Sequence, residues 1–452
     1  MQKTENELES FLQTHPETTH LDVLIIDLCG NAIGKRLPAS AMHSVFGKGT
    51  PVCGAMQLVD VMGNTEDPMG YGFSDGDPDA FAVPVTGTLC PVPWLGGNKS
   101  QVLCEFAGSV DGKPLWYEPR QILKDVIGRF AELDITPVLA VELEFYLLAA
   151  ERAADGTPSA AASPRSGLNE ASGKVLSLDK LDEFDTVLGA IESACRLQRI
   201  PTTSMISEYG AGQFEVNLAH QDDPLRAADH AALLRRAITG VSRAQGYDAS
   251  FMSKPFADQS GSGMHIHLSL VDEKGRNLFD PARAGADTSL AQAVGGLQAT
   301  MAESMAIFAP NLNVYRRFKP DEFVPVTRDW GENNRSVAFR IPPSDPANRR
   351  IEHRVSGAEA NPYLVIAAVL AGVHHGLSAK LDAGDKHRGN AGAEVDPDLP
   401  LKLWQALAAM RQATILPGYL GNDYLQIYAD VKQAEFDAFM DAIHPREYEW
   451  YL

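Results

Sequence analysis

Five arginines and a glutamate lie within twenty residues in the last third of the chain: Arg335, Arg340, Arg349, Arg350, Arg354 and Glu352. Guanidinium groups repel one another unless an anion lies among them, and their planar fork matches the oxygens of phosphates and carboxylates. The stretch therefore predicts a polyanion site. The alternative is a salt-bridged surface loop around residues 342–346, which read Pro-Pro-Ser-Asp-Pro. The stretch by itself does not decide between the two.

Acidic and histidine side chains alternate with apolar ones in three further segments, as they do in strands that bury one face. Their polar residues are Glu142 and Glu144, Glu215 with Asn217, and His265 with His267. Each segment alone is typical of a half-solvated strand. Together they predict a sheet face lined with carboxylates and imidazoles, which are ligands of hard divalent ions such as Mg²⁺ or Mn²⁺. Metals among the carboxylates and anions among the arginines indicate a metal–nucleotide site.

The sequence lacks the usual nucleotide-binding loops. Residues 167–174 resemble a phosphate-binding loop only superficially, because the spacing is wrong and Val175 stands where Ser or Thr is required. The glycine pairs at 210–212 and 261–263 lack the third glycine of a dinucleotide-binding turn. We expect these glycines to let the backbone approach a ligand closely.

The elements that position these residues follow from the hydrophobic pattern. Residues 1–112 are predicted to form a lead-in helix and a small β-rich domain, with strands at 21–28, 80–88 and 101–106. The pattern changes near residue 112, so residues 113–452 are predicted to form a larger domain of helices and short strands. Residues 149–174 are expected to be a mobile surface insertion. Helices are expected at 118–133, 181–199, 224–245, 289–309, 401–412 and 434–443.

Composition narrows the partners and the compartment. The net charge of -20 disfavours nucleic acid as a partner, and the chain opens Met-Gln-Lys-Thr-Glu-Asn-Glu without a basic and apolar signal segment. The longest uncharged window, 360–379, contains Asn361, Pro362 and two histidines, so it predicts a buried helix rather than a membrane span. Five cysteines without a Cys-x-x-Cys pair are typical of reduced thiols in the cytoplasm.

The order of the polar segments resembles the glutamine synthetase family. The matching stretches are 141–145, 208–216, 261–269, 334–342, 350–354 and 360–363. The resemblance implies an α+β fold with a small β-grasp N-terminal domain. It also implies a catalytic domain built on an antiparallel sheet funnel with surrounding helices. The chain would form a ring-shaped homo-oligomer, expected to be a dodecamer, with active sites between subunits.

The resemblance also implies roles for individual residues. Glu144, Glu208 and Glu215 would hold one metal, and Glu142, His265 and Glu352 another. Gly261, Arg317 and Arg354 would bind glutamate. Arg335, Arg340 and Arg350 would neutralise phosphates, Arg335 as a catalytic residue, and His267 and Ser269 would lie close to the nucleotide. In the implied reaction, ATP phosphorylates the γ-carboxylate of glutamate and an amine displaces phosphate.

Two departures from the family pattern concern the amine. The Asp-Gly-Ser segment of ammonia-using members is replaced at 51–56 by Pro-Val-Cys-Gly-Ala-Met, which has no carboxylate. In the flap at 317–325, Phe323 stands where the family carries a glutamate, and Glu322 is displaced by one position. These departures, with segments 27–35 and 447–452, resemble the γ-glutamylpolyamine synthetase branch. That branch implies L-glutamate, ATP and a polyamine such as putrescine or spermidine as substrates, in polyamine catabolism.

An alkylamine must lose a proton before it attacks. Its pKa resembles that of Lys, so only about one molecule in a few thousand is uncharged at neutral pH. Our hypothesis is that Glu322 takes this proton; the alternative is that Glu322 is a solvated loop residue. Two other functions stay open: a ligase for ammonia or a small monoamine, and a non-catalytic structural or regulatory assembly. The second is disfavoured, because a structural chain gains nothing from a costly buried polar set.

Overall fold

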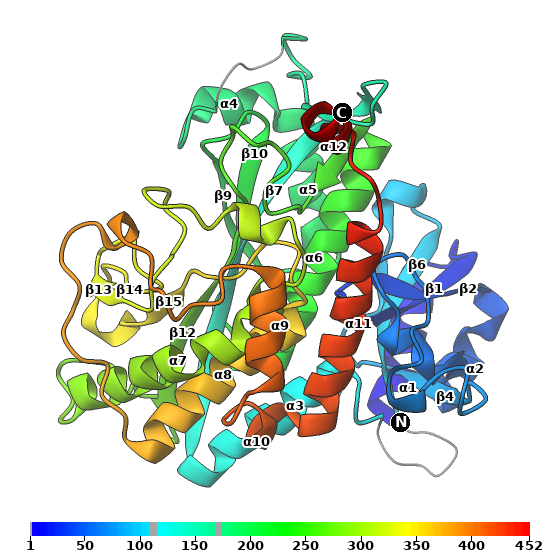
Figure 1. The fold of residues 1–452 in the computed structure, drawn as a ribbon. Coiled ribbons are helices and arrows are strands. Elements are labelled where there is room, and N and C mark those ends of the chain that lie inside the picture. Colours follow the sequence, from blue (N-terminus) through cyan, green and yellow to red (C-terminus); the bar gives the residue numbers. More distant parts are fainter. Residues whose placement is uncertain (1, 108–114, 169–172) are drawn as a thin grey trace.

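The computed structural model describes residues 2–107, 115–168 and 173–452, and contains two sheets with helices packed around them (Figure 1). The boundary predicted at residue 112 lies outside the described residues. The prediction of an α+β fold is confirmed. Most strand pairs are antiparallel, and strands and helices do not alternate regularly along the chain.

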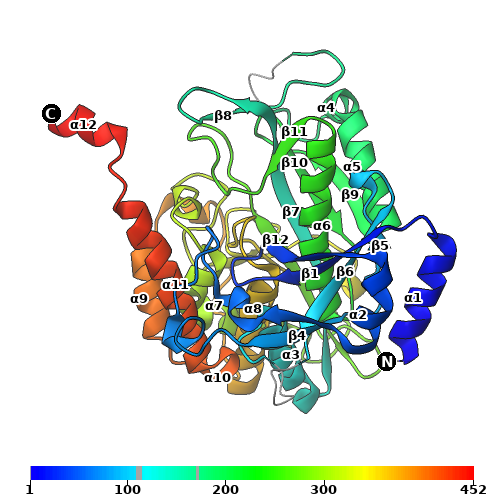
Figure 2. The ribbon, with the colours of Figure 1, turned by 90° about the vertical axis from the view of Figure 1, so that its right-hand side faces the viewer.

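The first sheet uses residues 20–106. Its strands are β1 (His20–Ile26), β2 (Ala32–Pro38), β3 (Thr50–Cys53), β4 (Asp79–Pro84), β5 (Cys90–Pro91) and β6 (Lys99–Phe106). They lie in the order β2-β1-β6-β4-β3, with β5 on β6, and only the β1–β6 pair is parallel. The helices α1 (Gln2–Thr14) and α2 (Met42–Lys48) pack on each other beside this sheet (Figure 2).

The second sheet carries the polar residues singled out in the sequence. Its order is β13-β14-β15-β12-β7-β10-β9, with β8 and β11 also paired to β7, and all pairs but β13–β14 are antiparallel. The strands are β7 (Ile135–Arg152), β8 (Pro158–Ala160), β9 (Thr202–Ser207), β10 (Gln213–Leu218), β11 (Tyr247–Ser250), β12 (Met264–Asp272), β13 (Trp330–Glu332), β14 (Phe339–Ile341) and β15 (Ile351–His353).

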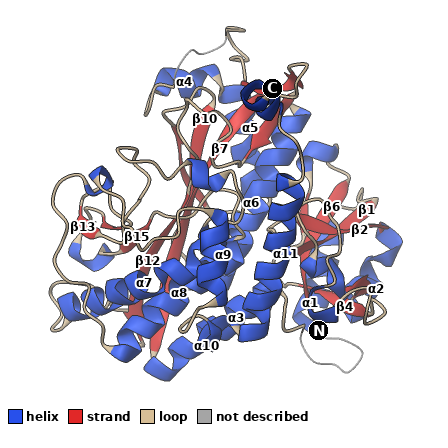
Figure 3. Ribbon diagram, viewed as in Figure 1, coloured by secondary structure: helices blue, strands red, loops and turns tan. Residues whose placement is uncertain are grey.

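Helices pack against this second sheet and against one another, and the last helix lies apart from them (Figure 2 and Figure 3). They are α3 (Pro119–Phe130), α4 (Leu178–Glu183), α5 (Asp185–Leu197), α6 (Pro224–Ala244), α7 (Ala286–Phe308), α8 (Pro362–Ala379), α9 (Leu403–Arg411), α10 (Pro417–Leu420), α11 (Asn422–Met440) and α12 (Pro445–Tyr451). Among the described residues, α8 is the one helix long and apolar enough to cross a membrane, but 78% of its apolar window is buried inside the protein. The prediction of a buried helix there is confirmed, and Asn361 caps it by accepting hydrogen bonds from the amides of Tyr363 and Leu364.

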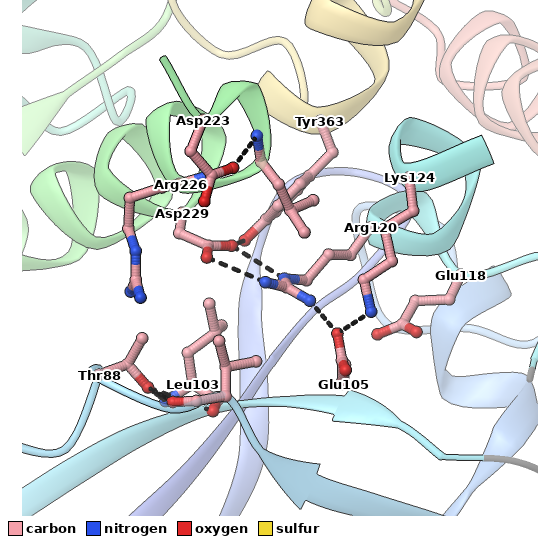
Figure 4. A network of polar contacts seen from close by, with 12 residues as sticks. Thr88, Leu103, Glu105, Glu118, Arg120, Lys124, Asp223, Arg226, Asp229 and Tyr363 are labelled. Carbon is pink, nitrogen blue, oxygen red and sulfur yellow. Dashed lines mark hydrogen bonds and ion pairs between the residues drawn. The ribbon is translucent and has the colours of Figure 1, made fainter. Parts of the chain in front are cut away.

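A buried network of charges joins the two sheets through α3, α6 and α8 (Figure 4). Arg120 at the start of α3 donates to both carboxylate oxygens of Asp229 in α6, at 2.9 and 3.1 Å. The same guanidinium and Lys124 contact Glu105 of β6, and the hydroxyl of Tyr363 in α8 donates to Asp229 at 2.8 Å. The first sheet is therefore fixed against the helices that pack on the second.

Two predictions about the elements can be compared with the structure. Residues 149–174 were expected to be a mobile insertion; β7 continues to Arg152 and pairs with β8 and β11, so the start of this range belongs to the sheet, whereas residues 169–172 lie outside the described residues. The predicted helix at 434–443 begins earlier, at Asn422, because Tyr424, Leu425, Ile427, Tyr428 and Val431 are buried in the protein core. The predicted helix at 181–199 is divided between α4 and α5 at Phe184, and the other predicted helices are present with ends shifted by a few residues.

Candidate active site

Strand register brings the polar residues into one row across five strands of the second sheet. Residues directly opposite in antiparallel strands project to the same face. Glu215 of β10 lies opposite Glu144 of β7, and Glu142 of β7 lies opposite His265 of β12. Glu352 of β15 follows, opposite both His267 of β12 and Arg340 of β14. The other face is apolar and buried, with side chains of Val141, Leu143, Phe145, Phe214, Val216 and Ile266.

In one half of this row, the carboxylates pair with histidine or arginine side chains. Nε2 of His267 lies 2.7 Å from Glu142, and Nδ1 of His265 lies 3.3 Å from it. Burial opposes ionisation of Glu142, but the two histidines lower its pKa below the ordinary value. Glu352 is only 1% exposed and binds Arg354 and Arg340, the latter at 2.7 Å. Burial would raise its pKa, but Arg354 and the histidines lower it to about 2.

The other half consists of carboxylates that crowd one another. Burial and the charge of Glu208 raise the pKa of Glu144 to about 8, although the amide of Gly263 donates to it at 2.8 Å. Burial and the charges of Glu142 and Glu144 raise the pKa of Glu215 well above its ordinary value. Burial likewise raises the pKa of Glu208. Such a cluster is costly unless a cation is bound within it.

The donor atoms fit divalent metal ions. Ligand atoms of Glu142, His265 and Glu352 lie within 4.8 Å of one another, and so do those of Glu144, Glu215 and His265. Carboxylates with one imidazole are typical ligands of Mg²⁺ or Mn²⁺. The first set is the one expected from the sequence. In the second, His265 takes the place expected for Glu208, whose carboxylate accepts a hydrogen bond from the amide of Tyr209 at 3.3 Å.

The arginines divide into those that face the row and those that do not. Arg317, Arg340 and Arg354 are buried, and Nε of each has no hydrogen-bond partner within the described ranges. Buried donors without partners are rare, so these three indicate an anion bound between them. Arg349 instead pairs with Asp287 at 2.7 Å, as the alternative interpretation of a salt-bridged loop expected.

A cavity of about 990 Å³ lies beside the row, next to Ser269 and Arg350. Its lining includes Ser269 and Arg350, and Nε of Arg350 donates to Nδ1 of His267 at 3.0 Å. His220, which the sequence did not single out, also lines it, with its ring 6.2 Å from that of His267. Its place two residues after β10 was the available signal. Arg335 is exposed, and its charge lowers the pKa of Glu208 against the effect of burial.

The glycine loops pack closely against neighbouring side chains, and their predicted approach to a ligand stays a prediction. A Cβ on Gly210 would lie 2.0 Å from the hydroxyl of Tyr146. A Cβ on Gly261 would lie 2.7 Å from Cγ of Arg317, and one on Gly263 would lie 3.0 Å from its Nη2. Close packing of Arg317 and Tyr146 against the backbone therefore requires these glycines, and the loop at 261–263 shapes the anion site from behind.

The flap residues predicted for the amine lie beside the arginines. The side chain of Glu322 is 36% exposed, and that of Phe323 is exposed. Oε2 of Glu322 lies 3.4 Å from Nζ of Lys254, a buried residue that the sequence did not single out. The charge of Glu322 also acts on Arg317. The carboxylate proposed to take a proton is therefore next to a proposed glutamate-binding residue.

Comparisons with known proteins agree with this geometry. The family described as glutamine synthetase, catalytic domain, matches residues 116–451. The chain belongs to the glutamine synthetase family. The predicted family and the predicted class of glutamate–amine ligase are thereby confirmed, and the glutamine-synthetase-type fold is supported by solved structures.

Individual members of the glutamine synthetase family are similar over nearly the whole chain. Gamma-glutamylputrescine synthetase PuuA of Escherichia coli K12 is 37% identical, over 99% of this chain and 94% of that protein. Glutamate–isopropylamine ligase of a Pseudomonas species is 31% identical, over 98% of this chain and 97% of that protein. A solved structure of GmaS in complex with ADP has a TM-score of 0.83 at 26% identity, covering 98% of this chain and 99% of that one.

Proposed function

We propose that this protein joins the γ-carboxyl group of L-glutamate to a primary amine of a polyamine such as putrescine or spermidine, with conversion of ATP to ADP and phosphate. The single observation that supports the polyamine most strongly is the 37% identity with gamma-glutamylputrescine synthetase over almost the full chain. The missing carboxylate at 51–56 and Phe323 in the flap are in keeping with an amine larger than ammonia.

In the first step an oxygen of the glutamate γ-carboxylate attacks the γ-phosphorus of ATP, and ADP leaves. We propose that Arg335, Arg340 and Arg350 neutralise the phosphate oxygens, and that His267 and Ser269 contact the nucleotide in the cavity that Ser269 and Arg350 line. Gly261, Arg317 and Arg354 would hold glutamate, a role supported by the unpartnered Nε atoms of both arginines.

Divalent ions, when bound, would balance negative charge on the transferring phosphoryl group. We propose Glu142, His265 and Glu352 for one ion and Glu144, Glu208 and Glu215 for another. The raised pKa values of Glu144, Glu208 and Glu215 support a cation among them, because burial and mutual repulsion leave these carboxylates without a balancing charge. The donor set suits Mg²⁺ and Mn²⁺ alike.

In the second step the amine attacks the carbonyl carbon of the γ-glutamyl phosphate, a C–N bond forms, and phosphate leaves. The attacking nitrogen must first lose a proton, and we propose that Glu322 accepts it. Its partial exposure and its place beside Arg317 support this role. Replacement by glutamine removes the basic oxygen with little change in shape, so Glu322→Gln with unchanged kcat for putrescine would refute the assignment.

We propose that the chain works in the cytoplasm as a ring-type homo-oligomer, with a boundary near residue 112 between an N-terminal β-grasp domain and the catalytic domain. All five cysteines are free thiols, as expected for a reducing compartment. The short helix α12 stands away from the other elements and exposes Tyr448, Trp450 and Tyr451 (Figure 2). Exposed aromatic side chains of this kind support a contact with a second copy.

The function is tested by ADP release with ATP, Mg²⁺ and glutamate across ammonium, methylamine, ethanolamine, putrescine, spermidine and spermine, with the product detected by mass. Strong turnover with the polyamines and little with ammonium is expected. Ammonium or a monoamine as the best substrate would refute polyamine specificity within the ligase class. Absence of ADP release with every amine would favour the structural or regulatory alternative instead.

A further inference from the structure

Lys254 is a buried lysine that connects three segments of the site. Its side chain is 4% exposed, and Nζ donates to the carbonyl of Gln259 at 2.6 Å, just before the loop at 261–263. Its backbone exchanges hydrogen bonds with the side chain of Asn313, at 2.7 and 2.9 Å, shortly before Arg317. The same Nζ reaches Oε2 of Glu322 in the flap at 3.4 Å. Lys254 is thus fixed at its backbone and directed at the proposed base.

The charges around this contact are unbalanced. Among the described residues, Glu322 is the one carboxylate within 4.0 Å of the Lys254 ammonium group. Glu322 in turn faces a second lysine, Lys319, whose Nζ lies 3.9 Å from Oε1 and whose side chain is 51% exposed. One carboxylate therefore faces two lysines, and the buried lysine depends on it most, because water screens Lys319.

We propose that Lys254 is a positioning residue for the amine step, which holds the Glu322 carboxylate over the glutamate site and yields it to the ammonium group of the incoming amine. The proposal rests on the proposed function, since it assumes that Glu322 receives the proton of a cationic amine. Lys254 keeps its bond to the carbonyl of Gln259 during this exchange, so its charge stays beside the bound substrate.

This arrangement favours loss of the substrate proton. A like charge close by disfavours the charged form of an ammonium group, so the bound amine gives up its proton more readily than it does in water. The proton passes to a carboxylate oxygen of Glu322. The nitrogen lone pair then forms the C–N bond as the C–O bond to phosphate breaks.

The test compares an amine that must lose a proton with one that is already uncharged at neutral pH. The full-length protein and the variants Lys254→Met, Lys254→Arg and Lys319→Met are assayed for kcat and KM with putrescine and with hydroxylamine, from pH 7 to pH 10. For Lys254→Met we expect putrescine turnover at pH 7 to fall at least about tenfold, the effect of one pKa unit on the uncharged fraction. The loss should shrink as the pH rises, because more amine is uncharged in solution.

Hydroxylamine turnover of Lys254→Met should stay within about twofold of the parent. Hydroxylamine is already uncharged at neutral pH, so a change of one unit or less in its pKa at the site leaves its uncharged fraction almost the same. Lys254→Arg should recover most of the putrescine turnover because it keeps the charge. Lys319→Met is the matched control, on the same carboxylate but half exposed, and should have little effect.

Equal losses with both amines at every pH would mean that Lys254 only supports the fold, and no loss with putrescine would mean that it has no role; either result overturns the proposal. If the parent uses ammonium but not putrescine, the polyamine function fails, and the same comparison with ammonium still tests Lys254, since ammonium also must lose a proton. Hydroxylamine turnover also reports whether each variant is folded.

Discussion

Replacing Glu118 by glutamine should stabilise the protein, and increasingly so as the pH rises. Glu118 precedes α3 and is 3% exposed, in the network that joins the two sheets (Figure 4). Its carboxyl oxygens lie 3.3 and 3.2 Å from the amide nitrogen of Phe106. Burial raises its pKa from 4.5 to about 8, although the amide of Phe106 and Lys124 oppose the shift. The carboxyl is therefore uncharged in the folded protein at neutral pH.

The sign follows from proton counting. Between pH 4.5 and 8 the folded state holds a proton on Glu118 that the unfolded chain has lost, so the free energy of unfolding falls as the pH rises through this window. Each pKa unit corresponds to about 1.4 kcal/mol, so ionisation costs the parent about 3 kcal/mol at pH 7 and about 5 kcal/mol at pH 8 and above. Below pH 4.5 the contribution vanishes. A glutamine keeps the acceptor for Phe106 and never ionises.

The assay is urea unfolding, followed by circular dichroism at one protein concentration, of the parent and Glu118→Gln at pH 5, 6, 7 and 8. The variant should gain stability over the parent in steps of about 1.4 kcal/mol per pH unit. Glu132→Gln, an exposed change just after α3, is the matched control and should show a difference independent of pH. A parent whose stability relative to Glu118→Gln rises with pH would refute the reasoning.

Three further predictions concern the site. Glu352→Gln should lower metal-dependent ADP release by about 100-fold or more, because it removes a proposed metal ligand and the charge that balances two buried arginines; circular dichroism checks that it folds. Arg350→Met should raise the KM for ATP about tenfold or more, whereas Arg349→Met, which loses its pairs with Asp287 and Glu332, should not; steady-state kinetics separate them. Gly263→Ala should raise the KM for glutamate, since its Cβ would crowd Nη2 of Arg317 and Nε2 of His265, each at 3.0 Å, and glutamate titration of ADP release measures this.

The sequence predicted the polar face of the second sheet because a strand has a period of two. Glu142 and Glu144 alternate with apolar residues, and so do His265 and His267, and no tertiary information is needed to place each pair on one face. The residues that face each other on neighbouring strands depend on the strand register, and the sequence does not reveal this register. The pairing of Glu142 with both histidines is therefore a finding of the structure.

Two neighbouring arginines also show that the sequence does not reveal the partners of a side chain. Arg349 and Arg350 differ by one position, and only the short strand β15 after them determines that one binds Asp287 and the other His267. Contacts between distant parts of the chain also carry no local signal. Lys254 reaches Glu322 across sixty-eight residues, and nothing in the composition of either segment indicates the other. The glycine pattern likewise did not indicate that Tyr146 and Arg317 pack against the backbone at Gly210 and Gly261.

The two halves of the site carry opposite excess charge, and this couples the binding of a cation to the binding of an anion. Burial and mutual repulsion raise the pKa values of Glu144, Glu208 and Glu215, whereas Arg317, Arg340 and Arg354 keep Nε donors that have no hydrogen-bond partner among the described residues. Glu352 connects the halves, because it is a candidate metal ligand and also the anion that two of these arginines bind. A cation that engages Glu352 weakens its hold on the guanidinium groups and leaves them free for phosphate or carboxylate oxygens. Binding of a divalent cation and binding of an anionic substrate should therefore reinforce each other, and by linkage each must strengthen the other by the same factor.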